Sequence, residues 1–260
     1  MNKGFAANKV IRSFQEMPFG RLLAGKGRKT QNPPLPAILI FFLILFLLGV
    51  RTEAQQSALP KGFAYLEQIA PDIKQELRYF SDENFVGRPV DGYLVPKVIL
   101  TRQAAEALKR VQEELKPFGL GLKVYDGYRP QRAVNHFIRW ARDLEDTKTK
   151  SRYYPDVAKE NLFKEGYIAD KSSHSRGSTV DLTLTSLSDQ KEIDMGSSFD
   201  WFGPESWPTY TSASPSQRAH RLLLKLLMEK QGFNSYPQEW WHFTLRDEPF
   251  PETYFDFPVQ

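Results

Sequence analysis

The sequence of 260 residues contains no cysteine and only four histidines. The absence of cysteine excludes disulfide bonds, cysteine-ligated zinc, a thiol nucleophile and a lipid-modified N-terminal cysteine. Any metal site must therefore be built from histidine and carboxylate side chains. With so few histidines, only a few segments of the chain can contribute to such a site.

The chain also lacks an excess of positive charge beyond its first fifty residues. The whole sequence has a formal net charge of +4, from 35 basic and 31 acidic residues. Seven of the basic residues and one acidic residue, Glu16, fall in residues 1–50, which leaves residues 51–260 with a net charge of −2. This larger part gives no electrostatic argument for nucleic acid, which is therefore not an expected partner.

Residues 35–50 (LPAILIFFLILFLLGV) form a run of 16 apolar, uncharged residues that follows the basic segment. This length lies between a signal-peptide core of about 7–15 residues and a membrane span of about 20. Thr52 and Ala54 suit a cleavage site after Ala54, although the imperfect fit of Thr52 and the long basic segment leave an uncleaved anchor open. In either case residues 1–54 are predicted to be a leader, with membrane contact only through an uncleaved run. Residues 55–260 are then predicted to be exported, to the periplasm or cell envelope.

Residues 55–260 contain no internal repeat or low-complexity linker, so they are expected to form a single domain. Apolar residues at helical spacing predict three helices, at 101–116, from about 130 to 141, and at about 218–230. Strands are predicted at 120–125 and 179–184 by alternation, and a strand or strand-flanked turn at the aromatic-rich 238–245. Because helices and strands do not alternate regularly, the expected fold class is α+β with a mainly antiparallel sheet flanked by helices.

Two segments contain residues that suggest a metal-binding or catalytic site, and the first is SSHSRGSTVDLTL, residues 172–184. His174 and Asp181 lie seven positions apart, on either side of Gly177. A bend near Gly177 can bring the imidazole back toward the carboxylate, so that both side chains reach one metal ion. Taken alone, such a pair is more often an ordinary hydrogen bond than a pair of metal ligands.

The second segment is EWWHF, residues 239–243, which supplies Glu239 and His242. Catalytic zinc sites use three protein ligands and keep an open position for water, and a nearby free carboxylate can take the proton of that water. In a regular strand, residues 239 and 242 would face opposite sides, so a shared site requires a bulge or turn. The two tryptophans between them would more often be core packing than part of a site.

These two segments, together with YDGYRP at 125–130, closely resemble the VanX-type D-alanyl-D-alanine dipeptidases of the zinc D,D-peptidase superfamily. The likeness runs from about Phe63 to Gln260. It also includes GRPVDGY (87–93), MGSSFD (195–200) and LRDEPFPETYFDFPV (245–259). The His-x6-Asp and Glu-x-x-His patterns alone indicate the superfamily, whereas the longer matches favour the dipeptidase branch. The resemblance implies a Hedgehog/DD-peptidase-like fold and a small dipeptide, D-alanyl-D-alanine, as substrate.

Carried onto this sequence, the resemblance implies one zinc ion per chain, bound by His174, Asp181 and His242. It further implies that Glu239 is the catalytic base and that Arg129 stabilises the transition state. A single hydrogen-bond donor to a developing oxyanion is typically worth about 3–4 kcal/mol. Without the resemblance, Arg129 would read as a solvated residue before a helix.

Three more residues are candidates for substrate binding. Asp200 is the candidate counter-charge for the free ammonium of a dipeptide, by resemblance, although an aspartate in a polar loop often only makes a turn. Asp126 could orient Arg129 or a ligand histidine, and Ser172 is a further candidate. The two remaining histidines fall in predicted helices and are expected to be surface or packing residues.

Two alternatives to the dipeptidase stay open. One is a related D,D-carboxypeptidase or murein endopeptidase with a wide groove for longer chains. The other is a non-catalytic zinc-binding cell-wall domain, against which the free acid at Glu239 argues, because a purely structural site needs no base. The predicted export segment departs from the best-known dipeptidases of this branch, which act in the cytoplasm.

Overall fold

The structure of the protein, a computed structural model, describes residues 59–260. The predicted leader and its hydrophobic run lie outside the described residues. Within the described part, no helix is long and apolar enough to cross a membrane.

A five-stranded sheet with the strand order β2-β4-β5-β7-β6 forms the centre of the domain. Its strands are β2 (Lys74–Gln75), β4 (Leu120–Asp126), β5 (Thr179–Ser186), β6 (Phe233–Tyr236) and β7 (Glu239–Leu245). Only β2 and β4 pair in parallel, and the other three pairings are antiparallel. The predicted α+β class with a mainly antiparallel sheet is therefore confirmed.

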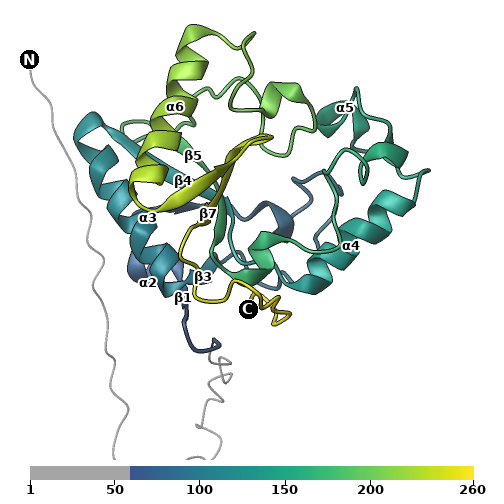
Figure 1. Cartoon of the computed structure of the whole chain (residues 1–260), viewed down its shortest axis with the longest axis horizontal. Helices are drawn as coiled ribbons and strands as arrows, with labels where there is room; N and C mark the ends of the chain where they lie inside the picture. The colour runs from purple at the N-terminus through teal and green to yellow at the C-terminus, as the bar shows by residue number, and fades with distance from the viewer. Residues whose placement is uncertain (1–58) are drawn as a thin grey trace, which may run out of the picture. The chain divides into compact units, whose positions relative to one another are not determined.

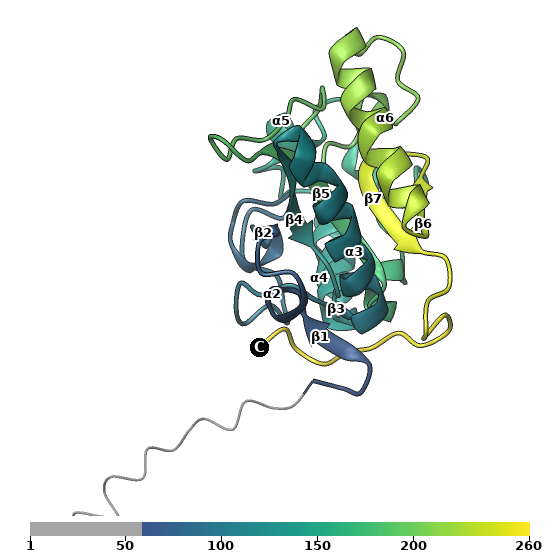
Figure 2. The same cartoon turned by 90° about the vertical axis from the view of Figure 1, so that its left-hand side faces the viewer.

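A second, two-stranded sheet pairs β1 (Phe63–Tyr65) with β3 (Ile99–Thr101). The α-helices are α2 (Leu66–Ile69), α3 (Arg102–Leu115), α4 (Gln131–Arg142), α5 (Lys150–Tyr153) and α6 (Pro215–Lys230). Short 3-10 turns lie at η1 (Arg78–Phe80), η2 (Lys116–Phe118), η3 (Lys159–Asn161), η4 (Ser173–Arg176) and η5 (Pro204–Ser206). Figures 1 and 2 show α3 and α6 on one side of the central strands and α4 on the other.

The three long helices occupy the predicted regions, and their first residues explain where they begin. The Thr101 side chain accepts a hydrogen bond from the Ala104 amide and caps α3, as its sequence suggested. Helix α6 begins three residues earlier than predicted, because Ser214 and Gln217 form a capping box around Pro215.

The two faces of the central sheet have different roles. On β5, Val180, Leu182 and Leu184 are fully buried in the core on the α3 and α6 side. Asp181 and Thr183 alternate with them and so point to the opposite face. That face is covered by α4 and by a cluster of aromatic side chains, and it carries the polar residues of the candidate site.

Candidate functional site

Asp126, Asp181 and His242 lie in a row across β4, β5 and β7. Asp126 is the register partner of Asp181, and Asp181 is in turn the partner of His242. Side chains of directly opposed residues in antiparallel strands project from the same face. Strand pairing therefore brings together three polar side chains that are up to 116 positions apart in the sequence.

His174 reaches this row from η4. The Ser172 side chain caps the turn by accepting a hydrogen bond from the His174 amide, and Gly177 ends it in the left-handed conformation at φ +85°. A side chain at Gly177 would collide with the Phe63 ring, 2.2 Å from its Cβ position. The predicted bend is present, and it places the His174 Nε2 atom 3.2 Å from Asp181 Oδ2.

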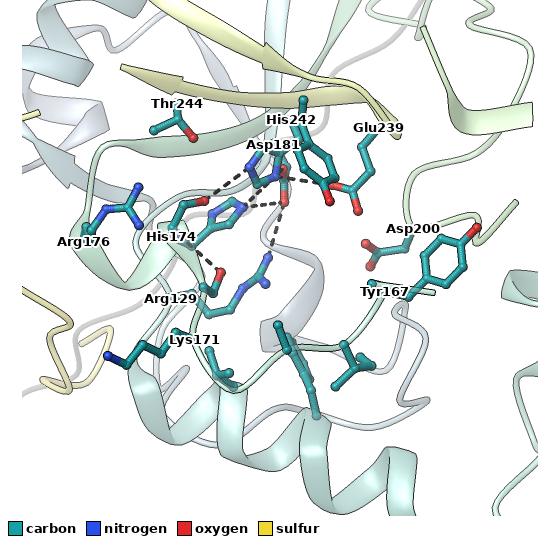
Figure 3. A pocket seen from close by; sticks show the side chains of 18 of the residues that line it. Arg129, Tyr167, Lys171, His174, Arg176, Asp181, Asp200, Glu239, His242 and Thr244 are labelled. Atoms are coloured by element: carbon teal, nitrogen blue, oxygen red, sulfur yellow. Dashed lines mark hydrogen bonds and ion pairs between the residues drawn. The ribbon is translucent and has the colours of Figure 1, made fainter. Parts of the chain in front are cut away.

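The ligand atoms of His174, Asp181 and His242 all lie within 4.8 Å of one another. The Nε2 atom of His174 is 3.3 Å from Nδ1 of His242, which is itself 3.1 Å from Oδ1 of Asp181. Figure 3 shows the two rings and the carboxylate converging on one point. Two imidazole nitrogens and one carboxylate oxygen suit a zinc ion that keeps a fourth position open.

The outer nitrogen of each histidine ring is also held in place. Nδ1 of His174 lies 2.7 Å from the carbonyl oxygen of Gly127, to which it donates when protonated, leaving Nε2 free as an acceptor or ligand. Nε2 of His242 lies 3.3 Å from the hydroxyl of Ser173. Such contacts fix the orientation and tautomer of metal-binding histidines. The sequence prediction missed Ser173, although it directly precedes His174.

Glu239 joins the cluster through an irregularity in β7. The register between β6 and β7 shifts between Ser235 and Tyr236, so that Tyr236 pairs with Glu239 and Ser235 with Phe243. A site shared by Glu239 and His242 required such a bulge or turn, and the bulge brings Oε2 of Glu239 within 3.3 Å of His242 Nδ1. Glu239 is half-buried and lines the same cavity as the three ligand candidates.

The electrostatics of the cluster favour a bound cation. Burial alone would lower the pKa of His242, but its hydrogen bonds to Asp181 and Glu239 raise that pKa to about 9. Burial alone would raise the pKa of Asp181, yet His174 and His242 hold it below its ordinary value. Two carboxylates thus concentrate negative charge at a point that faces two imidazole nitrogens, as a metal-binding site requires.

Arg129 lies between two of the buried carboxylates. Its guanidinium donates to Asp126 Oδ2 at 2.9 Å and to Asp181 Oδ2 at 3.4 Å. Its carbon centre lies 4.9 Å from the ring centre of Tyr79 and 5.2 Å from that of Phe137. Opposed carboxylates on adjacent strands repel each other, and the positive guanidinium offsets this repulsion. Its hydrogen bonds to both carboxylates in turn fix its position.

Asp126 is fully buried and is shared between Arg129 and Tyr93, whose hydroxyl donates to its other carboxylate oxygen at 2.8 Å. Its distance to Nδ1 of His174 is 3.6 Å, too long for a hydrogen bond. Burial raises the pKa of Asp126, although the nearby charge of Arg129 opposes the shift. Asp126 was considered as a group that orients either Arg129 or a ligand histidine. The structure shows a direct hydrogen bond only to Arg129 of these two.

Asp200 lies at one end of a cavity of about 560 Å³ that is also lined by Arg129, Glu239 and the three ligand candidates, but not by Asp126. Its side chain is buried, and the hydroxyl of Tyr79 donates to it at 3.0 Å. Burial raises the pKa of Asp200 well above its ordinary value, and the charge of Asp181 adds to this effect. Ser172 also lines the cavity. Tyr79 was not identified from the sequence, because no local pattern marks it.

Two cations stand at the other end of the cavity, Lys171 and Arg176. Figure 3 shows both on the side of His174 that faces away from Asp200. Arg176 forms an ion pair with Glu248 at 2.6 Å, whereas Lys171 lies over the ring of Tyr254, 4.7 Å from its centre. The cavity is therefore acidic at its buried end and basic at its outer end.

The remaining histidines lie outside this cavity, as predicted. On α4, Nδ1 of His136 accepts a hydrogen bond from the Asp91 amide. On α6, Nδ1 of His220 lies 2.8 Å from the carbonyl oxygen of Asp194. Neither ring lies among the residues that line the cavity.

The chain matches several known proteins. A sequence model of the D-ala-D-ala dipeptidase family matches residues 60–260. The chain is 43% identical to the D-alanyl-D-alanine dipeptidase of Enterococcus faecium over 199 residues, which are 76% of this chain and 98% of the relative. The D-alanyl-D-alanine dipeptidase of Streptomyces coelicolor is also 43% identical, over 197 residues with the same coverage. A solved structure of the D,D-pentapeptidase VanY with Zn(II) has a TM-score of 0.35 and 15% identity, and the match covers 59% of this chain and 76% of that one.

Proposed function

The chain belongs to the D-alanyl-D-alanine dipeptidase family, and from this premise we propose that it hydrolyses the dipeptide D-alanyl-D-alanine with one zinc ion. The observation that carries the proposal is that four kinds of catalytic or binding group line one cavity. A ligand set of two histidines and an aspartate, a free carboxylate, a buried guanidinium and a second buried carboxylate all line it.

Each group has a distinct part in the proposed reaction. His174, Asp181 and His242 would hold zinc, which supplies Lewis-acid activation of a carbonyl and of a water molecule. Glu239 accepts the proton of the attacking water and passes it to the nitrogen of the leaving amine. Arg129 donates a hydrogen bond to the substrate carbonyl oxygen as negative charge develops there.

The charges at the two ends of the cavity fit a molecule with both termini free. At neutral pH a dipeptide carries an ammonium at one end and a carboxylate at the other. We place the ammonium beside Asp200, where Tyr79 already orients the carboxylate. The substrate carboxylate then lies toward the outer end, beyond Ser172, where Lys171 supplies positive charge and Glu248 offsets that of Arg176.

Acetylation of the substrate amine is expected to reduce kcat/KM by about 10³-fold or more relative to free D-alanyl-D-alanine. The acetyl group removes the ammonium, leaves Asp200 buried without its charge partner, and adds bulk at the closed end. The measurement is hydrolysis of both compounds by purified residues 55–260. A D,D-carboxypeptidase would prefer the acylated compound, because its substrate continues in that direction, so comparable rates would contradict the dipeptidase proposal.

We also propose that residues 1–54 export the domain, because a basic segment precedes the apolar run 35–50. Cell fractionation of the full chain is expected to place it in the periplasm or membrane. A variant without residues 35–50 is expected to stay in the cytosol. Recovery of both forms from the cytosol would refute export.

A further inference from the structure

The segment GRPVDGY, residues 87–93, has no part in the reaction proposed above, and Tyr93 does not line the cavity. Its buried hydroxyl nevertheless donates to Oδ1 of Asp126 at 2.8 Å. No other group in the described part of the chain donates to that oxygen. The second oxygen, Oδ2, accepts from both Nε and Nη2 of Arg129, at 2.9 Å each. Asp126 thus joins Tyr93 to the guanidinium.

The position of Arg129 depends mainly on this aspartate. The only other carboxylate that the guanidinium contacts is that of Asp181, at 3.4 Å, which is longer than an ordinary N–H···O hydrogen bond. Asp181 is also a proposed zinc ligand. Asp126 is therefore the closer acceptor and the one with no other part in the site, so its carboxylate sets where the guanidinium lies.

Burial makes the contact between Tyr93 and Asp126 a strong one. Burial and the charge of Asp126 both raise the pKa of Tyr93, so the hydroxyl stays protonated and donates to the carboxylate. Hydrogen bonds to an ionised acceptor are stronger than those between neutral groups. Without the hydroxyl, Oδ1 would be a buried acceptor with no donor, and the carboxylate would gain by turning away. The guanidinium would move with it.

The last residues of the chain hold Tyr93 itself in place. Tyr93 pairs with Val259 in an isolated parallel bridge, and backbone hydrogen bonds from either side of Tyr93 join it to Val259, both at 2.8 Å. Gly92 is left-handed at φ +91°, and a Cβ atom there would lie 2.8 Å from Cγ of Pro130, the residue after the arginine. The backbone beside Tyr93 therefore packs directly against the segment that carries the guanidinium.

We propose that Tyr93 is a positioning residue, which holds Asp126 and through it keeps the guanidinium of Arg129 where negative charge develops on the substrate. This inference rests on the proposed dipeptidase function, in which Arg129 donates to the substrate carbonyl oxygen. A small displacement of such a donor weakens a hydrogen bond that forms fully only in the transition state. Loss of the hydroxyl therefore slows the chemical step and leaves the binding of the dipeptide nearly unchanged.

The test compares Tyr93→Phe with the matched control Tyr128→Phe. Tyr128 is also buried, but its hydroxyl donates to the carbonyl oxygen of Phe257 and not to Asp126. In Tyr93→Phe, kcat for D-alanyl-D-alanine is expected to fall about 10-fold or more, while KM changes less than about 2-fold and zinc content stays the same. Tyr128→Phe is expected to keep kcat within about 2-fold of the wild type. An equal fall in both variants overturns the proposal.

Double variants test whether the effect passes through Arg129. Arg129→Gln removes the charged donor and is expected to lower kcat by about 10²–10³-fold. Adding Tyr93→Phe to Arg129→Gln is expected to lower kcat less than about 2-fold further, because the group that Tyr93 positions is already absent. A further loss as large as in the wild-type background shows that Tyr93 acts by another route, which overturns the proposal. Circular dichroism establishes folding, and Tyr93→Met, which also lacks the hydroxyl, replaces a Tyr93→Phe variant that is not folded.

Hydrogen exchange at Nε–H of Arg129, followed by NMR, separates this proposal from the dipeptidase function. This group donates to Asp126 at 2.9 Å, and its signal is assigned by its absence from Arg129→Gln. Exchange is expected to be at least about 10-fold faster in Tyr93→Phe than in the wild type, and within about 2-fold of the wild type in Tyr128→Phe. A wild type that does not cleave the free dipeptide contradicts the proposed function, and exchange still tests the positioning. Wild-type exchange in a folded Tyr93→Phe or Tyr93→Met variant overturns it.

Discussion

Replacement of Glu239 by glutamine is expected to lower kcat for D-alanyl-D-alanine by about 10³-fold or more, with no change in zinc content. Positioned general acid–base groups typically contribute 10²–10⁴-fold, and glutamine has the shape of glutamate without its ability to carry a proton. Oε2 of Glu239 lies 3.3 Å from His242, beside the ligand atoms but outside the set of three that meet within 4.8 Å. This placement supports the proposed role of Glu239 as the group that moves a proton, with the metal held by the other three side chains.

Steady-state kinetics and metal analysis of the same preparations measure the two parts of this prediction. Glu252→Gln is a suitable control, because Glu252 is exposed and does not line the cavity. Loss of zinc together with activity in Glu239→Gln would identify Glu239 as a fourth ligand. Retention of near wild-type kcat would assign the base to another group.

The double variant His174→Ala, His242→Ala is expected to bind no zinc and to show no measurable hydrolysis. Two of the three proposed ligands are lost, and no cysteine is available to replace them. Metal analysis is expected to give one zinc per chain for the wild type. Added zinc is expected to raise the thermal unfolding temperature of the wild type but not of the double variant, since only a native site couples binding to folding.

The chain supplies its own matched control, because only four histidines are present. His136→Ala, His220→Ala removes the same number of imidazoles from positions on α4 and α6 outside the cavity. This variant is expected to keep its zinc and its activity. Equal zinc content in the wild type and the His174, His242 variant would refute the ligand assignment.

Local patterns were sufficient to predict the long helices. The apolar stripe of α3 and its Thr101 cap are both present, since helical periodicity and capping depend on neighbours within a few positions. Strand β2 was not predicted, because its two residues, Lys74 and Gln75, carry no period at all. The strand order of the sheet depends on pairings between distant segments, which no local pattern encodes.

The residues of the candidate site also fall into two groups, those that a local sequence pattern marks and those that it does not. His174, Asp181, Glu239 and His242 belong to two short motifs, and the structure brings all four together. The contacts of Tyr79 and Lys171 could not be predicted, because they depend on how η1 and the loop before η4 pack against the sheet. The bulge in β7 was required by chemistry alone, since the sequence of the strand gives no sign of where it lies.

The pairing of Asp181 with His242 across β5 and β7 also bears on how misfolded chains are recognised. A slip of one residue between these strands would turn one of the two side chains to the opposite face of the sheet and separate the ligands. Only correctly paired chains would then gain the free energy of zinc binding, about 4 kcal/mol when free zinc is 1,000 times its dissociation constant. Misregistered chains would stay less stable and more open to proteolysis. Zinc binding would therefore favour the survival of correctly paired chains.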